Sequence, residues 1–303
     1  MQAERVVAPD LMAEARAAAK DVDALFAALL ASPGDSRDPL YEAMRHAAID
    51  GGKRMRPLLV RAAGRLFNLS DERVLRVGAA IEAIHVYSLI HDDLPCMDDD
   101  DLRRGKPTLH KAYDEAIAVL AGDSLHDLAF ALLAHEATHP EAQVRVDLIA
   151  ELAKAAGPDG MAGGQVMDLE AEKAEPLDLD SITRLQQLKT GALIEYAVEA
   201  ACILGQVGEG LRIPYRGYAR NVGLAFQIAD DLLDVDGDET KAGKRLKKDE
   251  DAGKATFVSL MGEQRAREQA AMLVEQANEH LAHHGGEADL LRAIARYSIE
   301  RDR

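Results

Sequence analysis

Apolar residues recur at the three- to four-residue spacing of an α-helix along most of this chain. The clearest segments run over residues 11–30, 74–90, 116–134, 182–204 and 218–233. Ala, Leu, Glu, Arg and Ile dominate the composition of these segments, as is typical of helices. No segment shows the two-residue alternation of a half-buried strand. The pattern therefore predicts an all-α protein.

Turn-forming residues separate the predicted helices. Proline or glycine falls at residues 32–35, 139–140, 157–160, 208–210 and 283–286, and a longer charged segment covers residues 236–254. None of these breaks has the character of a domain linker, and no repeat of fixed period is present. The sequence predicts a single-domain helical bundle over residues 1–303.

Composition narrows the class of protein. With 303 residues, of which 48% are hydrophobic, the chain can bury a substantial core. The net charge of −17 argues against nucleic acid as a partner, and any anionic substrate would need local basic residues or metal ions. No apolar stretch is predicted to reach the length needed to insert into a membrane. Two cysteines and the lack of a signal-like start indicate a cytoplasmic location.

The first candidate site is an acidic segment, residues 91–105, that follows a long apolar run. Asp92 and Asp98 are six residues apart, so a regular helix would place them on different faces. Pro95 cannot continue a helix and disfavours helical geometry at Leu94. We therefore expect a helix to end near Asp93 and the chain to fold back, so that Asp98 lies beside Asp92.

The second candidate site is the acidic segment at residues 226–236. Asp230 and Asp234 are four residues apart, so a helix places both carboxylates on one face. Either segment alone is about as typical of a solvated acidic loop or a weak calcium site as of a metal site that binds a substrate. Two carboxylate sets together favour several Mg²⁺ ions that hold a diphosphate, because Mg²⁺ typically takes one or two carboxylates plus substrate phosphate oxygens.

A basic segment, Gly51–Pro57, leads into the next predicted helix. Glycines such as Gly52 expose backbone N–H groups, and Lys53 and Arg56 are predicted to share one face. The segment is a candidate diphosphate clamp that needs no metal, although a plain turn with solvated side chains is the alternative. Arg54, on the neighbouring face, is predicted to be solvated.

Further polar residues flank the first acidic segment. His85 is either a donor to a substrate oxygen or a core histidine with satisfied hydrogen bonds. Arg103 and Arg104 are adjacent and point in different directions, so they are predicted to serve two anions, with a salt-bridged loop as the alternative. Tyr87 and Ser88 precede Asp92 by roughly 6–8 Å along a helix axis, and Tyr87 is a candidate floor of a pocket.

Glycines and lysines mark the second half of the chain. Gly163-Gly164 and Gly191 are predicted to interrupt helices and to turn carbonyl dipoles toward a cavity, where they would stabilise a carbocation. The charged segment that contains Lys244 and Lys254 is either a lid over a diphosphate or a solvated loop.

Five ordered motifs resemble those of the trans-polyprenyl diphosphate synthases, and most closely the bacterial short-chain farnesyl diphosphate synthases. The resemblance covers almost the whole chain, and it rests on residues 51–57, 92–98, 103–105, 189–190 and 226–234. It implies the helical bundle of isoprenoid synthases with a central active-site cavity. It also implies a cytoplasmic homodimer that condenses isopentenyl diphosphate with dimethylallyl or geranyl diphosphate to give farnesyl diphosphate.

The resemblance implies a role for each matching residue. Three Mg²⁺ ions, with Mn²⁺ as an alternative, would be held by Asp92, Asp98 and Asp230, with Asp93, Asp231 and Asp234 as further ligands or support. The allylic diphosphate would bind Arg103, Lys189 and Lys244, and isopentenyl diphosphate would bind Gly52, Lys53, Arg56, His85 and Arg104. Thr190 and Gln227 would line the path of the reacting carbons, and Lys254 matches a basic position of a lid.

Product length and class leave alternatives open. In the family, Tyr87 and Ser88 occupy the positions that limit the growing chain, and an aromatic residue at the former favours a farnesyl product. A geranylgeranyl product is the alternative. A class I terpene cyclase would not need the basic clamp at Gly51–Pro57, and a non-catalytic partner subunit would be expected to have lost its aspartates, so both are less favoured.

Overall fold

The computed structural model describes residues 10–171, 177–236 and 256–300. The chain divides into two compact units. The N-terminal unit comprises Met12–Arg61 and Ser70–Ile149, and the C-terminal unit comprises Met1–Leu11, Ala62–Leu69 and Ala150–Arg303. The division falls within two helices, α3 (Met55–Leu66) and α7 (Ala142–Ala156), and at the first residue of α1 (Leu11–Leu29).

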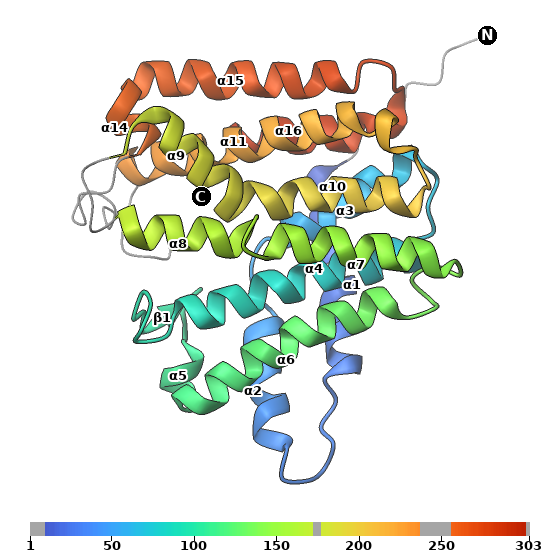
Figure 1. The fold of residues 1–303 in the computed structure, drawn as a ribbon, viewed down its shortest axis with the longest axis vertical. Helices are drawn as coiled ribbons and strands as arrows, with labels where there is room; N and C mark the ends of the chain where they lie inside the picture. The colour runs from blue at the N-terminus through green and yellow to red at the C-terminus, as the bar shows by residue number, and fades with distance from the viewer. Residues whose placement is uncertain (1–9, 172–176, 237–255, 301–303) are drawn as a thin grey trace. The chain divides into compact units, whose positions relative to one another are not determined.

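In the N-terminal unit a pair of long helices forms the centre. α4 (Asp71–Asp92) packs along α6 (Glu115–Ala134), and α2 (Asp38–Ala48) packs against both (Figure 1). The short helix α5 (Leu109–Ala112) joins this group, and β1 (Leu102–Arg103) pairs antiparallel with β2 (Lys106–Pro107). α6 begins where the Asp114 side chain accepts a hydrogen bond from the backbone N–H of Ile117 at 2.7 Å, which satisfies one free donor of the first turn.

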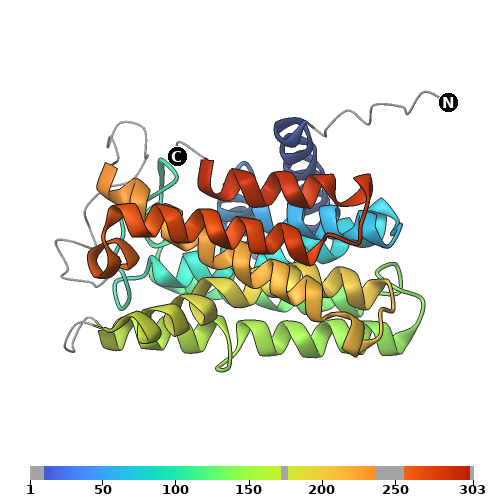
Figure 2. The ribbon, with the colours of Figure 1, turned by 90° about the horizontal axis from the view of Figure 1, so that it is seen from above.

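In the C-terminal unit α11 (Ile213–Asp236) is the central element. It packs against α10 (Ala192–Leu204), α15 (Glu263–His280) and α16 (Asp289–Glu300), and α15 and α16 also contact each other (Figure 2). The remaining elements are α8 (Met161–Ala171), α9 (Leu179–Gln186), the π-helical η1 (Gln187–Gly191), the 3-10 turns η2 (Glu209–Leu211) and η3 (Gly286–Ala288), and α14 (Phe257–Met261).

These elements confirm the all-α prediction for the described residues. Each of the five predicted segments corresponds to helix, and the segment at 182–204 is divided by the π-helical turn η1. Two details differ from the prediction. The two-residue strands β1 and β2 form a small hairpin, and α8 runs unbroken through Gly163-Gly164, because Gly164 packs against a neighbouring backbone instead of ending the helix.

The prediction that no apolar stretch reaches membrane-spanning length is not supported. By length and composition alone, α4 and α6 pass as candidate spans, with mean hydropathies of 1.2 and 1.6 over their most apolar windows. In α4, 61% of that window is buried inside the protein. A helix that is apolar on nearly all sides is typical of a protein core, so α4 is a core helix here.

Candidate active site

The first acidic segment forms a tight turn at the end of α4. The helix ends at Asp92, and the backbone N–H of Asp98 donates to the Asp92 carbonyl at 2.8 Å. This confirms the prediction that the chain folds back and brings Asp98 beside Asp92. Asp92 is half-buried and Asp98 is exposed, so the pair lies where the helix opens to solvent.

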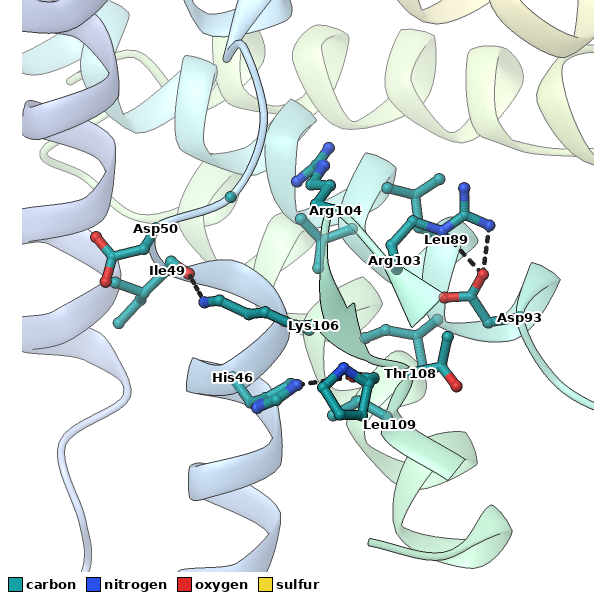
Figure 3. A pocket seen from close by; sticks show the side chains of 15 residues that line it. His46, Ile49, Asp50, Leu89, Asp93, Arg103, Arg104, Lys106, Thr108 and Leu109 are labelled. Atoms are coloured by element: carbon teal, nitrogen blue, oxygen red, sulfur yellow. Dashed lines mark hydrogen bonds and ion pairs between the residues drawn. The ribbon is translucent and has the colours of Figure 1, made fainter. Parts of the chain in front are cut away.

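Asp93 instead points into the protein and pairs with Arg103. The carboxylate is 4% exposed and accepts from Arg103 Nε at 2.9 Å and from Arg103 Nη2 (Figure 3). Burial raises the pKa of the Asp93 carboxyl, which the Arg103 guanidinium opposes. Arg103 also reaches Asp100 at 3.3 Å. The predicted alternative of a salt-bridged loop is therefore correct for Arg103.

Arg104 occupies the turn of the β1–β2 hairpin. Arg104 and Gly105 both have positive φ, +55° and +77°, as the two central residues of a type I′ hairpin turn require. This turn separates the two arginine side chains, and the Arg104 guanidinium lies apart from the Arg103–Asp93 pair (Figure 3). It lies against Gly52, where an added Cβ would be 2.5 Å from Arg104 Cζ. The predicted divergence of the two arginines is confirmed.

Arg56, His85 and Arg104 form a cationic group with few internal partners. Within the described part of the chain, none of the three side chains makes a hydrogen bond or ion pair, and Arg56 Nε is buried without a partner. Burial lowers the pKa of Arg56 and of the Arg104 guanidinium, although Arg104 as a whole is an exposed residue. Burial and the neighbouring arginines, Arg56 first, hold the pKa of His85 well below its usual value. Such a site favours an anion, because an anion would satisfy these donors.

The basic segment at Gly51–Pro57 differs from the prediction in two respects. α3 begins at Met55, so Lys53 lies in the preceding turn and does not share a helix face with Arg56. Arg54 is not solvated: it is 2% exposed and pairs with Glu82 and Asp23. The prediction failed because both carboxylates come from distant helices, which local sequence does not reveal.

Tyr87 and Ser88 follow His85 on α4. The Tyr87 ring is half-buried and makes edge contacts with His91 and with His126 of α6, at centroid distances of 5.7 and 5.1 Å. Burial raises the pKa of the Tyr87 hydroxyl. Ser88 Oγ donates to the His85 carbonyl at 2.9 Å. Tyr87 is therefore the bulky, fixed side chain of the two.

The second acidic segment lies in α11 of the C-terminal unit. Asp230 and Asp234 are half-buried and one helical turn apart, as the spacing predicts. Asp231 accepts a hydrogen bond from the backbone N–H of Phe257 at 2.7 Å, which ties it to the start of α14. Gln227 is half-buried on the same helix.

Lys189 and Thr190 project from the π-helical turn η1 and are half-buried. Lys189 Nζ lies 2.6 Å from Asp168 Oδ2 on α8. A Cβ added at Gly164 would lie 2.2 Å from the backbone nitrogen of Lys189, so only glycine allows α8 to approach this closely. Sequence reasoning missed the roles of Gly164 and Asp168, for which the segment Gly-Gly-x-x-x-Asp is the only local signal. Lys244 and Lys254 lie outside the described residues.

The donor atoms fit Mg²⁺ shared with a substrate. Among the described residues, no three His, Cys, Asp or Glu side chains gather closely enough to hold a metal by themselves. The carboxylate sets belong to different units, and each is described within its own unit. Carboxylates are hard oxygen ligands, and Mg²⁺ is usually bound by one or two of them together with phosphate oxygens and water. The chemistry of Asp92, Asp98, Asp230 and Asp234 therefore suits this ion.

Two cavities accompany these residues. One of about 50 Å³ lies beneath the β1–β2 hairpin, lined by Asp93, Arg103 and Arg104 among others (Figure 3), and has room only for a few water molecules. Another, of about 570 Å³, lies in the C-terminal unit between α7, α10 and α11; Gly191 lies in its wall, whereas Lys189, Thr190 and Gln227 do not.

The fold and the paired acidic segments define the class of protein. A sequence profile described as polyprenyl synthetase matches residues 37–294, and the chain belongs to this family. It is a prenyltransferase. The chain is 45% identical over 271 residues to a farnesyl diphosphate synthase of Escherichia coli K12, covering 88% of this chain and 90% of the relative.

Two further comparisons bear on the product. A geranylgeranyl diphosphate synthase of Cyanophora paradoxa is 40% identical over 263 residues, covering 87% of this chain and 88% of the relative. A crystal structure of an FPP/GFPP synthase from Zymomonas mobilis has a TM-score of 0.89 and 56% identity, covering 95% of this chain and 99% of that one. The chain is thus similar to enzymes named for products of different length.

Proposed function

We propose that this prenyltransferase condenses isopentenyl diphosphate with dimethylallyl and geranyl diphosphate to give farnesyl diphosphate, with Mg²⁺ as the metal. The observation that carries the proposal is the group of Arg56, His85 and Arg104, whose side chains have no hydrogen-bond or ion-pair partner among the described residues. It gives a second diphosphate a site without metal. The similarity to enzymes named farnesyl diphosphate synthases supports this choice of reaction.

The allylic diphosphate binds at the aspartates in this proposal. Asp92, Asp98 and Asp230 would hold Mg²⁺, which would balance the several negative charges of the diphosphate, and Asp93, Asp231 and Asp234 would support them. Bound Mg²⁺ stabilises the negative charge that forms on the leaving diphosphate. Arg103 exchanges Asp93 for the substrate, and Lys189 completes the grip. Lys244 and Lys254 lie outside the described residues and keep the roles that the resemblance implies.

The second substrate binds at the basic clamp. Gly52, Lys53, Arg56, His85 and Arg104 hold isopentenyl diphosphate, and the depressed pKa of His85 keeps its ring neutral, so it contributes a hydrogen bond instead of a charge. Unpaired arginine forks suit the oxygen atoms of a diphosphate.

The chemistry follows from these two anion sites. The allylic C–O bond breaks and its electron pair leaves with the diphosphate, and the allylic cation remains in a cavity with few nucleophiles. Thr190 and Gln227 line the path of the reacting carbons. The isopentenyl double bond then attacks the cation to form the new C–C bond. A proton leaves the adjacent carbon, and the released diphosphate accepts it, because no side-chain base is assigned there.

Tyr87 is proposed to set the product length, with Ser88 beside it. Its ring is held between His91 and His126, so it blocks the direction in which a chain would grow along α4. Removing the ring should let elongation continue, because the six ring carbons and the hydroxyl oxygen that fill this space are lost. We expect Tyr87→Ala to make products longer than farnesyl diphosphate, identified as alcohols after dephosphorylation.

The control for this experiment is Tyr113→Ala. Tyr113 is also a half-buried tyrosine with its ring edge against a histidine, His46, at 6.1 Å, but it follows α5. The Tyr113→Ala variant should leave product length unchanged.

A wild-type enzyme that already makes geranylgeranyl diphosphate would overturn the choice of product and leave the reaction class intact. Product formed without isopentenyl diphosphate would instead indicate a terpene cyclase, and no product without a second chain would indicate a non-catalytic subunit.

Assembly and location are part of the proposal. We propose a cytoplasmic homodimer in which residues 1–303 act as one polyprenyl synthase domain, with no nucleic acid partner and no membrane insertion. Val119 and Leu120 on α6 are 40% and 50% exposed, as expected of a face that meets a second copy. Neither Cys96 nor Cys202 forms a disulfide, which is consistent with a reducing compartment. Sedimentation of the purified chain tests the dimer.

A further inference from the structure

Arg54 is a buried cation whose guanidinium is held by three parts of the N-terminal unit. Nη1 donates to Glu82 Oε1 at 2.8 Å, and Nη2 donates to Asp23 Oδ1 at 2.7 Å and to the Ala48 carbonyl. Its side chain is 1% exposed and that of Glu82 is 2% exposed. Arginine is rarely buried so deeply unless it is paired. These contacts join α1, the end of α2 and α4 at one point.

Arg54 is itself part of a strained turn, residues 50–54, that precedes α3. Asp50, Gly52 and Arg54 all have positive φ, at +56°, +73° and +48°. Each non-glycine residue in this conformation is strained and persists only where other contacts hold it. Asp23 supplies such a contact twice, because its Oδ2 also accepts from the Asp50 N–H at 3.3 Å. The ion-pair cluster therefore holds both ends of the turn.

The same turn carries the basic clamp. Lys53 precedes Arg54 directly, and Arg56 follows it in the first turn of α3. Glu82 lies one helical turn before His85 on α4. The cluster thus connects the backbone of Lys53 and Arg56 to the helix that carries His85. Its paired atoms are turned toward one another and are not available to a substrate.

We propose that Arg54, together with Glu82 and Asp23, positions the residues that bind isopentenyl diphosphate, and that the cluster does not itself contact the substrate. This inference rests on the proposed function. Without the cluster, the strained turn would relax and Lys53 and Arg56 would no longer converge with His85 on one diphosphate.

Glu82 also acts on the neighbouring arginines through its negative charge. Its charge acts on Arg54, Arg56 and Arg104 and opposes the lowering of the pKa that burial causes in the last two. Glu82 therefore offsets part of the positive charge of three neighbouring guanidinium groups, of which it pairs with Arg54. Arg54 itself is the member of this group that an anion cannot reach.

The test removes the buried pair as a unit. In Arg54→Met/Glu82→Met, one positive and one negative charge are lost, so the net charge of the clamp is unchanged. Apolar replacement of a whole buried ion pair is often neutral for stability, whereas removal of one partner is not. We expect a melting temperature within about 5 °C of wild type and a KM for isopentenyl diphosphate that rises about tenfold. The KM for geranyl diphosphate should change less than about twofold.

A matched control and a milder variant accompany it. Arg61 of α3 pairs with Asp21 of α1 at 2.8 Å, so Arg61→Met removes another ion pair to α1 without touching the turn. It should leave both KM values unchanged. Asp23 is 22% exposed, so Asp23→Asn should fold even if the double variant does not, and it should raise the KM for isopentenyl diphosphate about threefold.

Calorimetric titration of isopentenyl diphosphate into each variant gives a readout that does not depend on turnover. Weaker binding in both cluster variants, with the control unchanged, supports the proposal. A folded double variant or a folded Asp23→Asn variant that binds isopentenyl diphosphate like wild type overturns it. So does an equal rise in both KM values. If the wild-type chain itself does not bind isopentenyl diphosphate, the proposed function fails instead.

Discussion

Replacing Gly164 with alanine tests whether the close approach of α8 to η1 places Lys189. A Cβ at position 164 would lie 2.2 Å from Lys189 N, 2.5 Å from Lys189 Cα and 2.8 Å from Leu188 C. Uncharged atoms of this kind rest about 3.5 Å apart, so the two backbones must separate by roughly 1 Å. The neighbours are backbone atoms, which cannot rotate away as a side chain can.

The expected loss of stability follows from two opposing effects. Over-packing of a tight contact costs about 1–3 kcal/mol, and alanine gains about 1 kcal/mol over glycine inside a helix. A backbone clash belongs at the upper end of the first range. We therefore expect Gly164→Ala to lower the free energy of unfolding by about 2 kcal/mol, measured by urea denaturation.

Activity should fall further than stability. Lys189 Nζ is held 2.6 Å from Asp168 on the same helix as Gly164, and a shift of about 1 Å in a positioning group can cost about 100-fold in rate. We expect kcat/KM for geranyl diphosphate to fall between about 10- and 100-fold in the folded enzyme. Steady-state kinetics with saturating isopentenyl diphosphate measures this.

The control is Gly223→Ala on α11. The nearest atom to a Cβ there is Gly191 Cα at 3.6 Å, an ordinary contact, so the variant should keep its activity and gain up to about 1 kcal/mol. If Gly164→Ala has the wild-type free energy of unfolding and the wild-type kcat/KM, the close approach of α8 to η1 affects neither stability nor activity. If it loses stability but keeps kcat/KM per folded molecule, the contact is structural and does not place Lys189.

Two further predictions concern protons and metal. Because the pKa of His85 in the folded protein lies well below the value of about 6.5 in the unfolded chain, the unfolded state binds more protons below that pH. The contribution of His85 is constant above about pH 6.5, and the free energy of unfolding should decrease as the pH falls, by up to about 1.4 kcal/mol per unit. His85→Asn should show a shallower decrease between about pH 6.5 and 5, and equal slopes would refute this reading. Chelation should abolish turnover and added Mg²⁺ should restore it, whereas activity that survives exhaustive chelation would contradict the roles given to Asp92 and Asp230.

Local chemistry explains which features the sequence predicted correctly. The long helices follow from apolar periodicity, and the return of Asp98 to Asp92 follows from Pro95, which acts on its immediate neighbours. The hairpin turn at Arg104-Gly105 was not predicted. Glycine at the second position of a two-residue turn favours a hairpin, but strands of two residues are too short to show the alternation of a strand.

Contacts between distant residues explain what was missed. Arg54 was expected in solvent, yet Glu82 and Asp23 lie 28 and 31 residues away along the chain and bury it. Asp168 lies 21 residues from Lys189, and the Gly-Gly-x-x-x-Asp segment does not indicate which residue Asp168 pairs with. Charges that are buried by tertiary partners look like surface charges in the sequence, so both assignments required the fold.

The π-helical turn η1 can also be regarded as one extra residue in an otherwise regular helix. Leu185 and Leu193 are both buried, at 3% and 0% exposure, and are eight residues apart. On an ideal helix that separation would place them about 80° apart, whereas seven residues would place them about 20° apart. Because a π-turn takes up one additional residue, α9 and α10 present their buried faces in phase.

Lys189 and Thr190 lie at this additional residue. Deletion of one residue between 187 and 191 would therefore produce a continuous α-helix with both apolar faces still aligned. Such a chain should fold, but it should lack the π-turn from which the side chains of Lys189 and Thr190 project. The phase of the two apolar faces therefore does not depend on which side chains occupy the π-turn.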